Sequence, residues 1–198
     1  MKKLSTIIFL GAAFFVTSAA FNSVKAQEDS TENETIHITE YSDYQCPACA
    51  YYHPFVKKLK EDLGDKIEVT QHFFPLRSHR YGAISARAAQ AARNQGKFIE
   101  MHNLLFENQQ EWASSANPTA IFVDYARRLG LDIEQFKEDL NSGETQRIVM
   151  ESRREGIRRG VQATPTFFIE GEKVRRLPRT YEGFKALVLT YINQNEEG

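Results

Sequence analysis

The chain has 198 residues, of which 41% are hydrophobic and 26% are charged, an ordinary composition for a globular protein. An aromatic content of 12% excludes a disordered chain. Strong apolar character is confined to about the first 20 residues, which excludes a membrane protein with several spans. The formal net charge of −1 gives no support for nucleic-acid binding. The length allows one domain, or one domain with an insertion.

The N-terminus has the layout of a secretory signal peptide, because Lys2 and Lys3 precede an apolar run over 4–16 and then small residues. We expect cleavage after Ala26, with Ala20 as a second possible site. An uncleaved membrane anchor is the alternative, and either form would export the domain. Cleavage after Ala26 removes three lysines and no acid, so the formal net charge changes from −1 to −4.

The first part of the exported chain predicts a strand, a helix and a second strand. The β-branched run 36–41 indicates a strand. After Cys49, apolar residues recur at helical spacing as far as Gly64, and Pro54 inside this helix is expected to kink it. Residues 67–74 indicate the second strand. A helical crossover between two strands predicts that they are parallel.

Residues 82–159 show helical patterns that no strand pattern interrupts. Asn117 and Pro118 are typical of an N-cap followed by proline in the first helical position, and Asp132 starts another short helix. A last helix is expected over 145–159. This stretch therefore predicts an all-helical block inserted between two parts that contain strands.

Strand character returns at 166–169, followed by a turn at 170–172 and a possible return strand at 173–175. A closing helix is expected over 181–192. The expected organisation is a signal peptide at 1–26, a linker at 27–34, a first α/β part at 35–81, the helical insertion at 82–159 and a second α/β part at 160–198.

The two cysteines, Cys46 and Cys49, lie between the first strand and its helix. As a structural disulfide this short loop would gain little, because closing it removes little entropy from the unfolded chain. As half of a zinc site it lacks ligands: His53 is within one turn, but no fourth candidate follows, and His53 is expected on a solvated face. A redox pair is favoured, since unpaired N–H groups at a helix N-terminus stabilise a thiolate.

These residues, taken in order, resemble the thioredoxin-fold superfamily and, within it, the bacterial DsbA-like thiol-disulfide oxidoreductases. The resemblance covers 35–192 and rests on matched segments of the sequence, namely Cys46-Pro47-Ala48-Cys49, Pro54 in the following helix, the run Phe73-Phe74-Pro75-Leu76, His102-Asn103-Leu104-Leu105-Phe106, the helical insertion, and Ala163-Thr164-Pro165-Thr166. It implies a thioredoxin fold of the α/β class with an all-helical insertion between its βαβ and ββα halves.

The resemblance also implies a role for each residue of the cysteine motif. Cys46, first at the helix end and expected to be the more exposed, is the nucleophile, and Cys49 is the resolving thiol. Pro47 fits an early helical position, where its missing N–H costs nothing. Ala48 departs from the strong oxidants of the family, which typically have histidine there, and alanine has no side-chain donor. The resemblance therefore supports disulfide chemistry firmly and a strongly oxidising potential weakly.

Three residues outside the cysteine motif complete the expected site. In the family, a cis proline, here Pro165, lies against the cysteine pair and leaves the backbone of the preceding residue, Thr164, free to bind extended substrate. Glu40 interrupts an apolar strand, and a buried acid there would have a raised pKa and could relay a proton to Cys49. His102, beside an apolar helical stripe, is expected in the core.

The expected function is that of an exported, monomeric enzyme that introduces disulfides into secreted proteins, in the periplasm or another extracytoplasmic space. The redox-active Cys46–Cys49 pair needs no dissociable cofactor and no metal, and a membrane quinone-linked partner is implied for its reoxidation. A disulfide reductase or isomerase of the same fold is the alternative. A metal-binding chaperone module that uses Cys46, Cys49 and His53 is the rival from another class.

Overall fold

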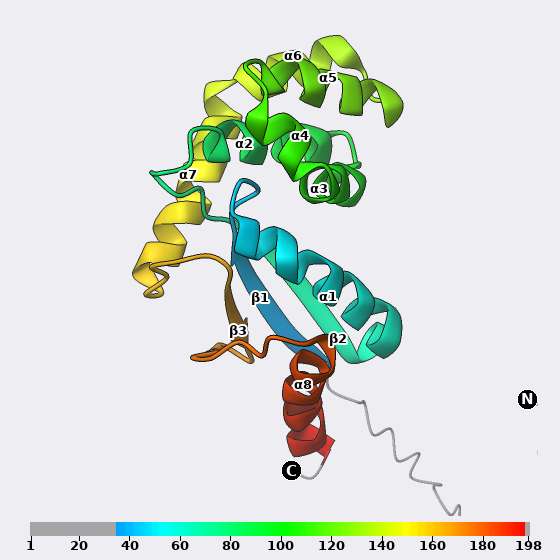
Figure 1. Ribbon diagram of the computed structural model, residues 1–198, viewed down its shortest axis with the longest axis vertical. Coiled ribbons are helices and arrows are strands. Elements are labelled where there is room, and N and C mark those ends of the chain that lie inside the picture. The colour runs from blue at the N-terminus through cyan, green and yellow to red at the C-terminus, as the bar shows by residue number, and fades with distance from the viewer. Residues whose placement is uncertain (1–34, 197–198) are drawn as a thin grey trace, which may run out of the picture. The chain divides into compact units, whose positions relative to one another are not determined.

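The computed structural model describes residues 35–196, so the expected signal peptide at 1–26 and linker at 27–34 lie outside the described residues (Figure 1). Its centre is a four-stranded sheet in the order β2-β1-β3-β4. The strands are β1 (Ile36–Ser42), β2 (Ile67–Phe73), β3 (Thr166–Ile169) and β4 (Glu172–Lys173). β1 and β2 are parallel, whereas β3 is antiparallel to both β1 and β4.

Alternation along β1 sends its side chains into two different cores. Ile36 and Ile38 are buried with side chains of α1 (Pro47–Leu63) and α8 (Tyr181–Glu196), so these two helices share a core with one face of the sheet. Tyr41 is buried in another cluster with Phe74 and Phe168. Because side chains alternate along a strand, Glu40 has the same parity as Ile38 and lies on the face that α1 and α8 cover.

The helix α1 begins directly after the first cysteine. Cys46 occupies the N-cap position with an extended backbone, and Pro47 is the first helical residue. Pro54 lies inside α1, which is continuous as far as Leu63 and is followed by a short 3₁₀ helix over Gly64–Lys66. The βαβ prediction is confirmed by the parallel register of β1 and β2, in which Ile36 lies opposite Ile67.

The inserted segment contains helices and no strand, as the sequence predicts. Its helices are α2 (Gly82–Asn94), α3 (Phe98–Glu107), α4 (Gln109–Ser114), α5 (Pro118–Arg128), α6 (Ile133–Asn141) and α7 (Gly143–Arg158). The side chains of Asn117 and Asp132 accept hydrogen bonds at the N-termini of α5 and α6, which confirms both expected caps. Figure 1 shows α2 to α6 gathered beyond the carboxyl end of β1, while α7 leads back beside the sheet.

The β-hairpin near the C-terminus is tighter than the sequence suggests. Glu170 and Gly171 both have positive φ, so the turn consists of these two residues, and Glu172 already belongs to β4. The predicted return strand at 173–175 is therefore wrong in its bounds, although the Val174 N–H still donates to the Phe167 carbonyl. Helix α8 extends to Glu196, beyond the expected end at 192. Within residues 35–196, no helix is long and apolar enough to cross a membrane.

Candidate active site

The two cysteines lie at the start of α1 and differ in exposure. Both are free thiols. Cys46 has 7% of its surface exposed to solvent, whereas Cys49, one turn into the helix, is completely buried. This confirms that Cys46 is the more accessible of the pair. Both side chains belong to a buried cluster that also contains Met101 and Leu105 of α3, so the inserted helices cover one side of the site.

The surroundings of Cys46 favour its thiolate form. Its pKa falls to about 5, chiefly because the Cys49 side chain forms a hydrogen bond with the Cys46 sulfur. Burial opposes this shift, while the neighbouring Thr164 side chain and the backbone N–H groups of Cys49 and Ala48 lower the pKa further. These N–H groups lack helical partners because they belong to the first turn of α1. Ala48, whose side chain has no donor, thus contributes through its backbone.

Cys49 has the opposite character. Burial raises its pKa well above the usual value, and the neighbouring Cys46 raises it further. Its sulfur accepts a hydrogen bond from the Asp43 backbone N–H at 3.5 Å. At neutral pH the reduced pair therefore consists of a thiolate at Cys46 and a thiol at Cys49, which is the asymmetry that a nucleophile and a resolving thiol require.

This asymmetry predicts the pH dependence of alkylation. In the reduced protein, iodoacetamide is expected to modify Cys46 with a rate that rises with pH around a midpoint near pH 5, because only the thiolate reacts. Cys49 should remain unmodified at neutral pH. Mass spectrometry after quenching at a series of pH values measures both. A midpoint for Cys46 near pH 9 would contradict the description of the site.

The residues before β3 complete the site. The Thr164–Pro165 peptide bond is cis, as the resemblance implies. The Thr164 carbonyl oxygen lies 3.4 Å from the Cys46 sulfur, within hydrogen-bonding distance of its thiol form. The Thr164 side chain is buried, and its hydroxyl has no hydrogen-bond partner among the described residues. The predicted substrate-binding residues therefore do lie beside the nucleophile.

Glu40 is buried, as the sequence predicts, with 2% of its surface exposed. Burial raises its pKa to about 7, against smaller opposing effects of the Ser42 hydroxyl and the charge of Lys60. Glu40 also contributes to the raised pKa of Cys49, which places the two groups in electrostatic contact. The role of Glu40 as a proton relay stays a prediction. The effect of Lys60 has no signal in the sequence, since nothing in the helical pattern of α1 marks this residue.

Asp43 holds the loop between β1 and the cysteines. Its buried carboxylate accepts hydrogen bonds from the backbone N–H groups of Gln45 and Leu76, both at 2.7 Å, and pairs with His79 Nδ1 at 2.8 Å. A Cβ atom added at Gly82 would lie 2.9 Å from this carboxylate, so glycine is required there. Asp43 therefore fixes the loop that presents Cys46 against the segment that enters the inserted helices.

Replacing Asp43 with asparagine is expected to lower the free energy of unfolding by about 1–3 kcal/mol, because either orientation of the amide sets an NH₂ group against a buried donor. Denaturant unfolding of the oxidised protein measures the loss. Asp124→Asn is the matched control, since Asp124 pairs with Arg127 on the surface and should change stability by less than about 0.5 kcal/mol. Equal stability of the two variants would contradict the assigned role of Asp43.

Two further contacts tie the inserted helices to the active-site loop. The Gln109 side-chain amide donates to the carbonyl oxygens of Tyr44 and Cys46, at 2.6 and 3.0 Å. The Tyr44 hydroxyl bonds His102 Nδ1 at 2.9 Å, and His102 is buried, as predicted. Burial lowers the pKa of His102 to about 3, so its ring is neutral and can accept the Tyr44 proton. Neither contact has a signal in the sequence.

The prediction for His53 is wrong. It was expected on a solvated face, but it is 7% exposed and its ring stacks on Phe106 of α3, with 5.0 Å between ring centroids. The reason is that α3 covers the side of α1 that carries His53, a contact that the sequence of α1 alone does not indicate. In the part of the chain that the structure describes, no three His, Cys, Asp or Glu side chains converge to form a metal site.

A thiolate at a helix N-terminus, a buried second thiol and a cis proline against them define a thioredoxin-fold thiol-disulfide oxidoreductase. The family model described as thioredoxin matches residues 31–189, which is most of the chain. The chain belongs to the thioredoxin family, and its architecture is that of the DsbA-like oxidoreductases within it.

Similar solved structures share this fold at low sequence identity. DsbA from Xylella fastidiosa is 17% identical with a TM-score of 0.68, over 83% of this chain and 88% of that one. BdbD from Bacillus subtilis, in its oxidised form, is 19% identical with a TM-score of 0.69, over 80% and 88%. A thioredoxin-like oxidoreductase from Silicibacter pomeroyi DSS-3 is 24% identical with a TM-score of 0.66, over 82% and 87%.

The chain is also similar to part of larger proteins that carry a different name. A protein named Na(+)/H(+) antiporter NhaA, from Herminiimonas arsenicoxydans, is 33% identical over 144 residues. Those residues make up 73% of this chain and 22% of that protein. A second NhaA, from Salinispora arenicola, is 34% identical over 70% of this chain and 20% of its own length. The chain thus spans about a fifth of the curated relatives it matches, and the activity in their name is theirs.

Proposed function

We propose that this protein is an exported oxidant that introduces disulfides into secreted proteins through Cys46 and Cys49. The observation that carries the proposal is the pKa of Cys46, lowered to about 5. A stabilised thiolate stabilises the reduced form of the pair, and a pair whose reduced form is stabilised is a strong oxidant. The backbone N–H groups of Ala48 and Cys49 supply part of this effect despite the missing side-chain donor at position 48.

The reaction proceeds in two exchanges. A client thiolate attacks the Cys46 sulfur of the oxidised pair, which breaks the Cys46–Cys49 bond and forms a mixed disulfide. Cys49 leaves as a thiolate and takes up a proton, for which Glu40 is the proposed donor because its pKa lies near 7. A second client thiolate then attacks the client sulfur of the mixed disulfide. Cys46 leaves readily, since its thiolate is stable, and the client has lost two electrons to the pair.

The setting of this reaction is also part of the proposal. The segment at 1–26 would direct export to the periplasm or another extracytoplasmic space, with a linker at 27–34 before the α/β parts at 35–81 and 160–198 and the insertion at 82–159. The pair needs no dissociable cofactor, because its two sulfurs store the electrons. A membrane quinone-linked partner would reoxidise it, and the domain would act as a monomer.

A reductase or isomerase is the second candidate, favoured by one observation. Ala48 provides no side-chain donor to the Cys46 thiolate, so the reduced form is less stabilised than with a donor at that position. A reductase passes electrons to the client, the reverse of an oxidant, whereas an isomerase rearranges client disulfides with no net electron transfer. The metal-binding chaperone module remains a rival on chemical grounds and would show as zinc binding by the reduced protein that is lost with either cysteine.

Oxidative refolding distinguishes the candidates. Stoichiometric oxidised protein is expected to accelerate the recovery of activity by reduced, unfolded ribonuclease A, while the protein itself is recovered reduced. The same protein should be a poor catalyst of insulin reduction by dithiothreitol. Fast insulin reduction without oxidation of ribonuclease would contradict the oxidant assignment and support the reductase.

A further inference from the structure

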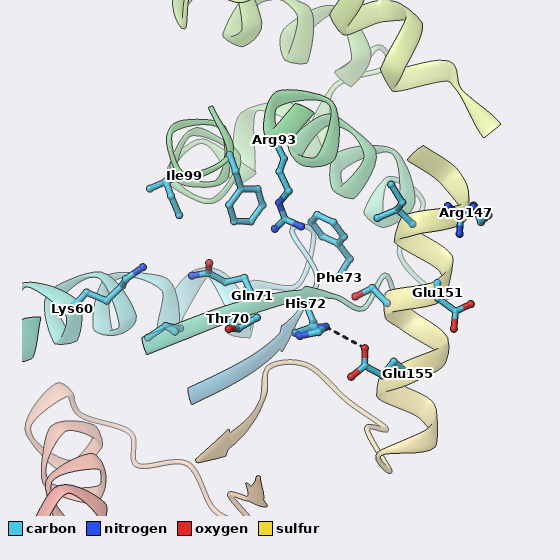
Figure 2. A pocket seen from close by; sticks show the side chains of 14 residues that line it. Lys60, Thr70, Gln71, His72, Phe73, Arg93, Ile99, Arg147, Glu151 and Glu155 are labelled. Atoms are coloured by element: carbon cyan, nitrogen blue, oxygen red, sulfur yellow. Dashed lines mark ion pairs between the residues drawn. The ribbon is translucent and has the colours of Figure 1, made fainter. Parts of the chain in front are cut away.

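A cavity of about 640 Å³ follows the outer edge of β2 (Figure 2). β2 is the outermost strand of the sheet, and no other strand within residues 35–196 pairs with its second edge. Five consecutive residues of the strand, Val69 to Phe73, line the cavity. Because alternate side chains point to opposite faces of a sheet, a cavity lined by consecutive residues runs along the edge itself, where N–H and C=O groups point outward.

The cavity carries a positive charge that the described residues do not neutralise. Arg93 reaches into it from α2 (Figure 2), and its guanidinium lies 3.8 Å from the ring centroid of Phe98 and 5.1 Å from that of Phe73. No ion pair is recorded between Arg93 and any carboxylate of residues 35–196. Lys60 of α1, which also lines the cavity, likewise forms no ion pair with a carboxylate of residues 35–196. The aromatic contacts and a hydrogen bond from the guanidinium to Gln90 Oε1, at 3.3 Å, orient Arg93 without neutralising its charge, so it can still bind an anion.

Of the two acidic residues of the cavity, one is paired with arginines. Glu151 of α7 pairs with Arg154 and Arg158, at 3.0 and 3.1 Å. Glu155 lies 3.7 Å from His72 Nδ1, the contact marked in Figure 2, and accepts a hydrogen bond from the Tyr41 hydroxyl. Because burial lowers the pKa of His72, its ring is neutral at pH 7 and leaves the charge of Glu155 in place. The remaining cation, Arg147, pairs with Glu144. Two cations, Lys60 and Arg93, are thus set against one carboxylate, so the unmatched charge at the β2 edge is positive, and it lies beside the apolar side chains of the lining.

We propose that the edge of β2 binds an extended, acidic segment of an unfolded client protein as an added strand. An added strand supplies the main-chain hydrogen bonds that an open edge offers, and its alternate side chains supply specificity. Carboxylates of the segment would face Arg93 and Lys60, and its apolar side chains would contact Ile99 and Ile148. The inference rests on the proposed function in one respect, that the client is unfolded; binding itself involves neither cysteine.

A cysteine-free peptide tests the groove separately from the redox chemistry. The probe is a fluorescein-labelled octapeptide of alternating glutamate and valine, titrated with the oxidised protein and followed by anisotropy. Saturable binding is expected, and lysine in place of glutamate should abolish it. A peptide methylated on alternate backbone nitrogens keeps its charge but loses the N–H groups that would donate hydrogen bonds to β2. It should therefore bind at least about tenfold more weakly. Equal binding of the methylated peptide would overturn strand addition.

Charge reversal in the protein gives the matched comparison. Arg93→Glu should weaken binding by about tenfold or more, because it places a carboxylate against those of the peptide. Arg128→Glu is the control: Arg128 also lies over an aromatic ring, that of Tyr125, but on α5 and outside the cavity. It should leave the affinity unchanged within about twofold. Equal losses in both variants would mean that only the overall charge of the protein matters, which contradicts the proposal.

Amide NMR of the unaltered protein keeps the proposal testable if Arg93→Glu does not fold. Peptide should shift the amides of Val69 to Phe73 and slow their hydrogen exchange. Shifts confined to the exposed arginines at 175–179, or sedimentation showing that the edge pairs two copies of the chain, would overturn the proposal. Binding with no oxidase activity would refute the proposed function alone, and oxidase activity without binding would refute the groove alone.

Discussion

Replacing Cys46 with serine is expected to reduce disulfide exchange to the background rate of the assay buffer. The physical reason is that exchange needs a thiolate, and Cys46 is the only accessible sulfur of the pair, with a pKa of about 5. Serine retains the size of the side chain, but its hydroxyl does not ionise at neutral pH. The oxidation of reduced ribonuclease, followed by the recovery of its activity, measures the effect.

Cys49→Ser is the matched variant, because it removes the other sulfur by the same substitution. Its Cys46 thiolate can still exchange with a client disulfide, but no resolving thiol is present to release the client. The variant should therefore accumulate a covalent complex with a disulfide-containing peptide, visible on a non-reducing gel and absent with Cys46→Ser. If Cys46→Ser forms the complex and Cys49→Ser does not, the assignment of the nucleophile is wrong.

Replacing Glu40 with glutamine is expected to stabilise the protein, and to do so only above acidic pH. Burial raises the pKa of Glu40 from 4.5 to about 7, so the folded state holds its proton at pH values where the unfolded state has released it. The resulting penalty is absent below about pH 4, grows as the pH rises towards 7 and is complete above that. Its full size is on the order of 3 kcal/mol. Glutamine does not ionise and carries no such penalty.

Denaturant unfolding at pH 4.5 and pH 8 measures this difference. The unaltered protein and Glu40→Gln are both measured in the oxidised form, because the disulfide removes the titration of the two thiols. Glutamine should stabilise the protein clearly at pH 8 and little at pH 4.5. In the same variant, the rate at which a client thiol displaces Cys49 from the oxidised pair should no longer change with pH near 7. A stability difference that is equal at both pH values would contradict a buried acid with a raised pKa.

The sequence sufficed for the part of the site that one segment contains. The position of Cys46 and Cys49 at a strand-to-helix junction follows from local patterns, and alternation along a strand is enough to bury Glu40. The cis bond before Pro165 needed the family resemblance, because residues alone favour trans proline. The sequence order of strands and helices likewise determined the parallel pairing of β1 and β2, through the helical crossover between them.

What could not be predicted depends on contacts between distant segments. Asp43 pairs with His79, and Gln109 of the insertion binds the carbonyl of Cys46, without any periodicity that connects them. His53 lies one helical turn beyond the buried Cys49, on the same side of α1. That spacing was an available signal, but it becomes informative only once α3 is known to cover this side. Errors therefore concentrated where the inserted helices meet the thioredoxin part.

A redox titration of the purified protein in glutathione buffers tests the central claim most directly. The fraction of reduced Cys46–Cys49 pair is read by thiol alkylation at each ratio of reduced to oxidised glutathione. A stabilised Cys46 thiolate predicts a potential near −120 mV, the value of a dedicated DsbA oxidant. A potential near −270 mV, that of thioredoxin, would contradict the account and identify the protein as a reductant.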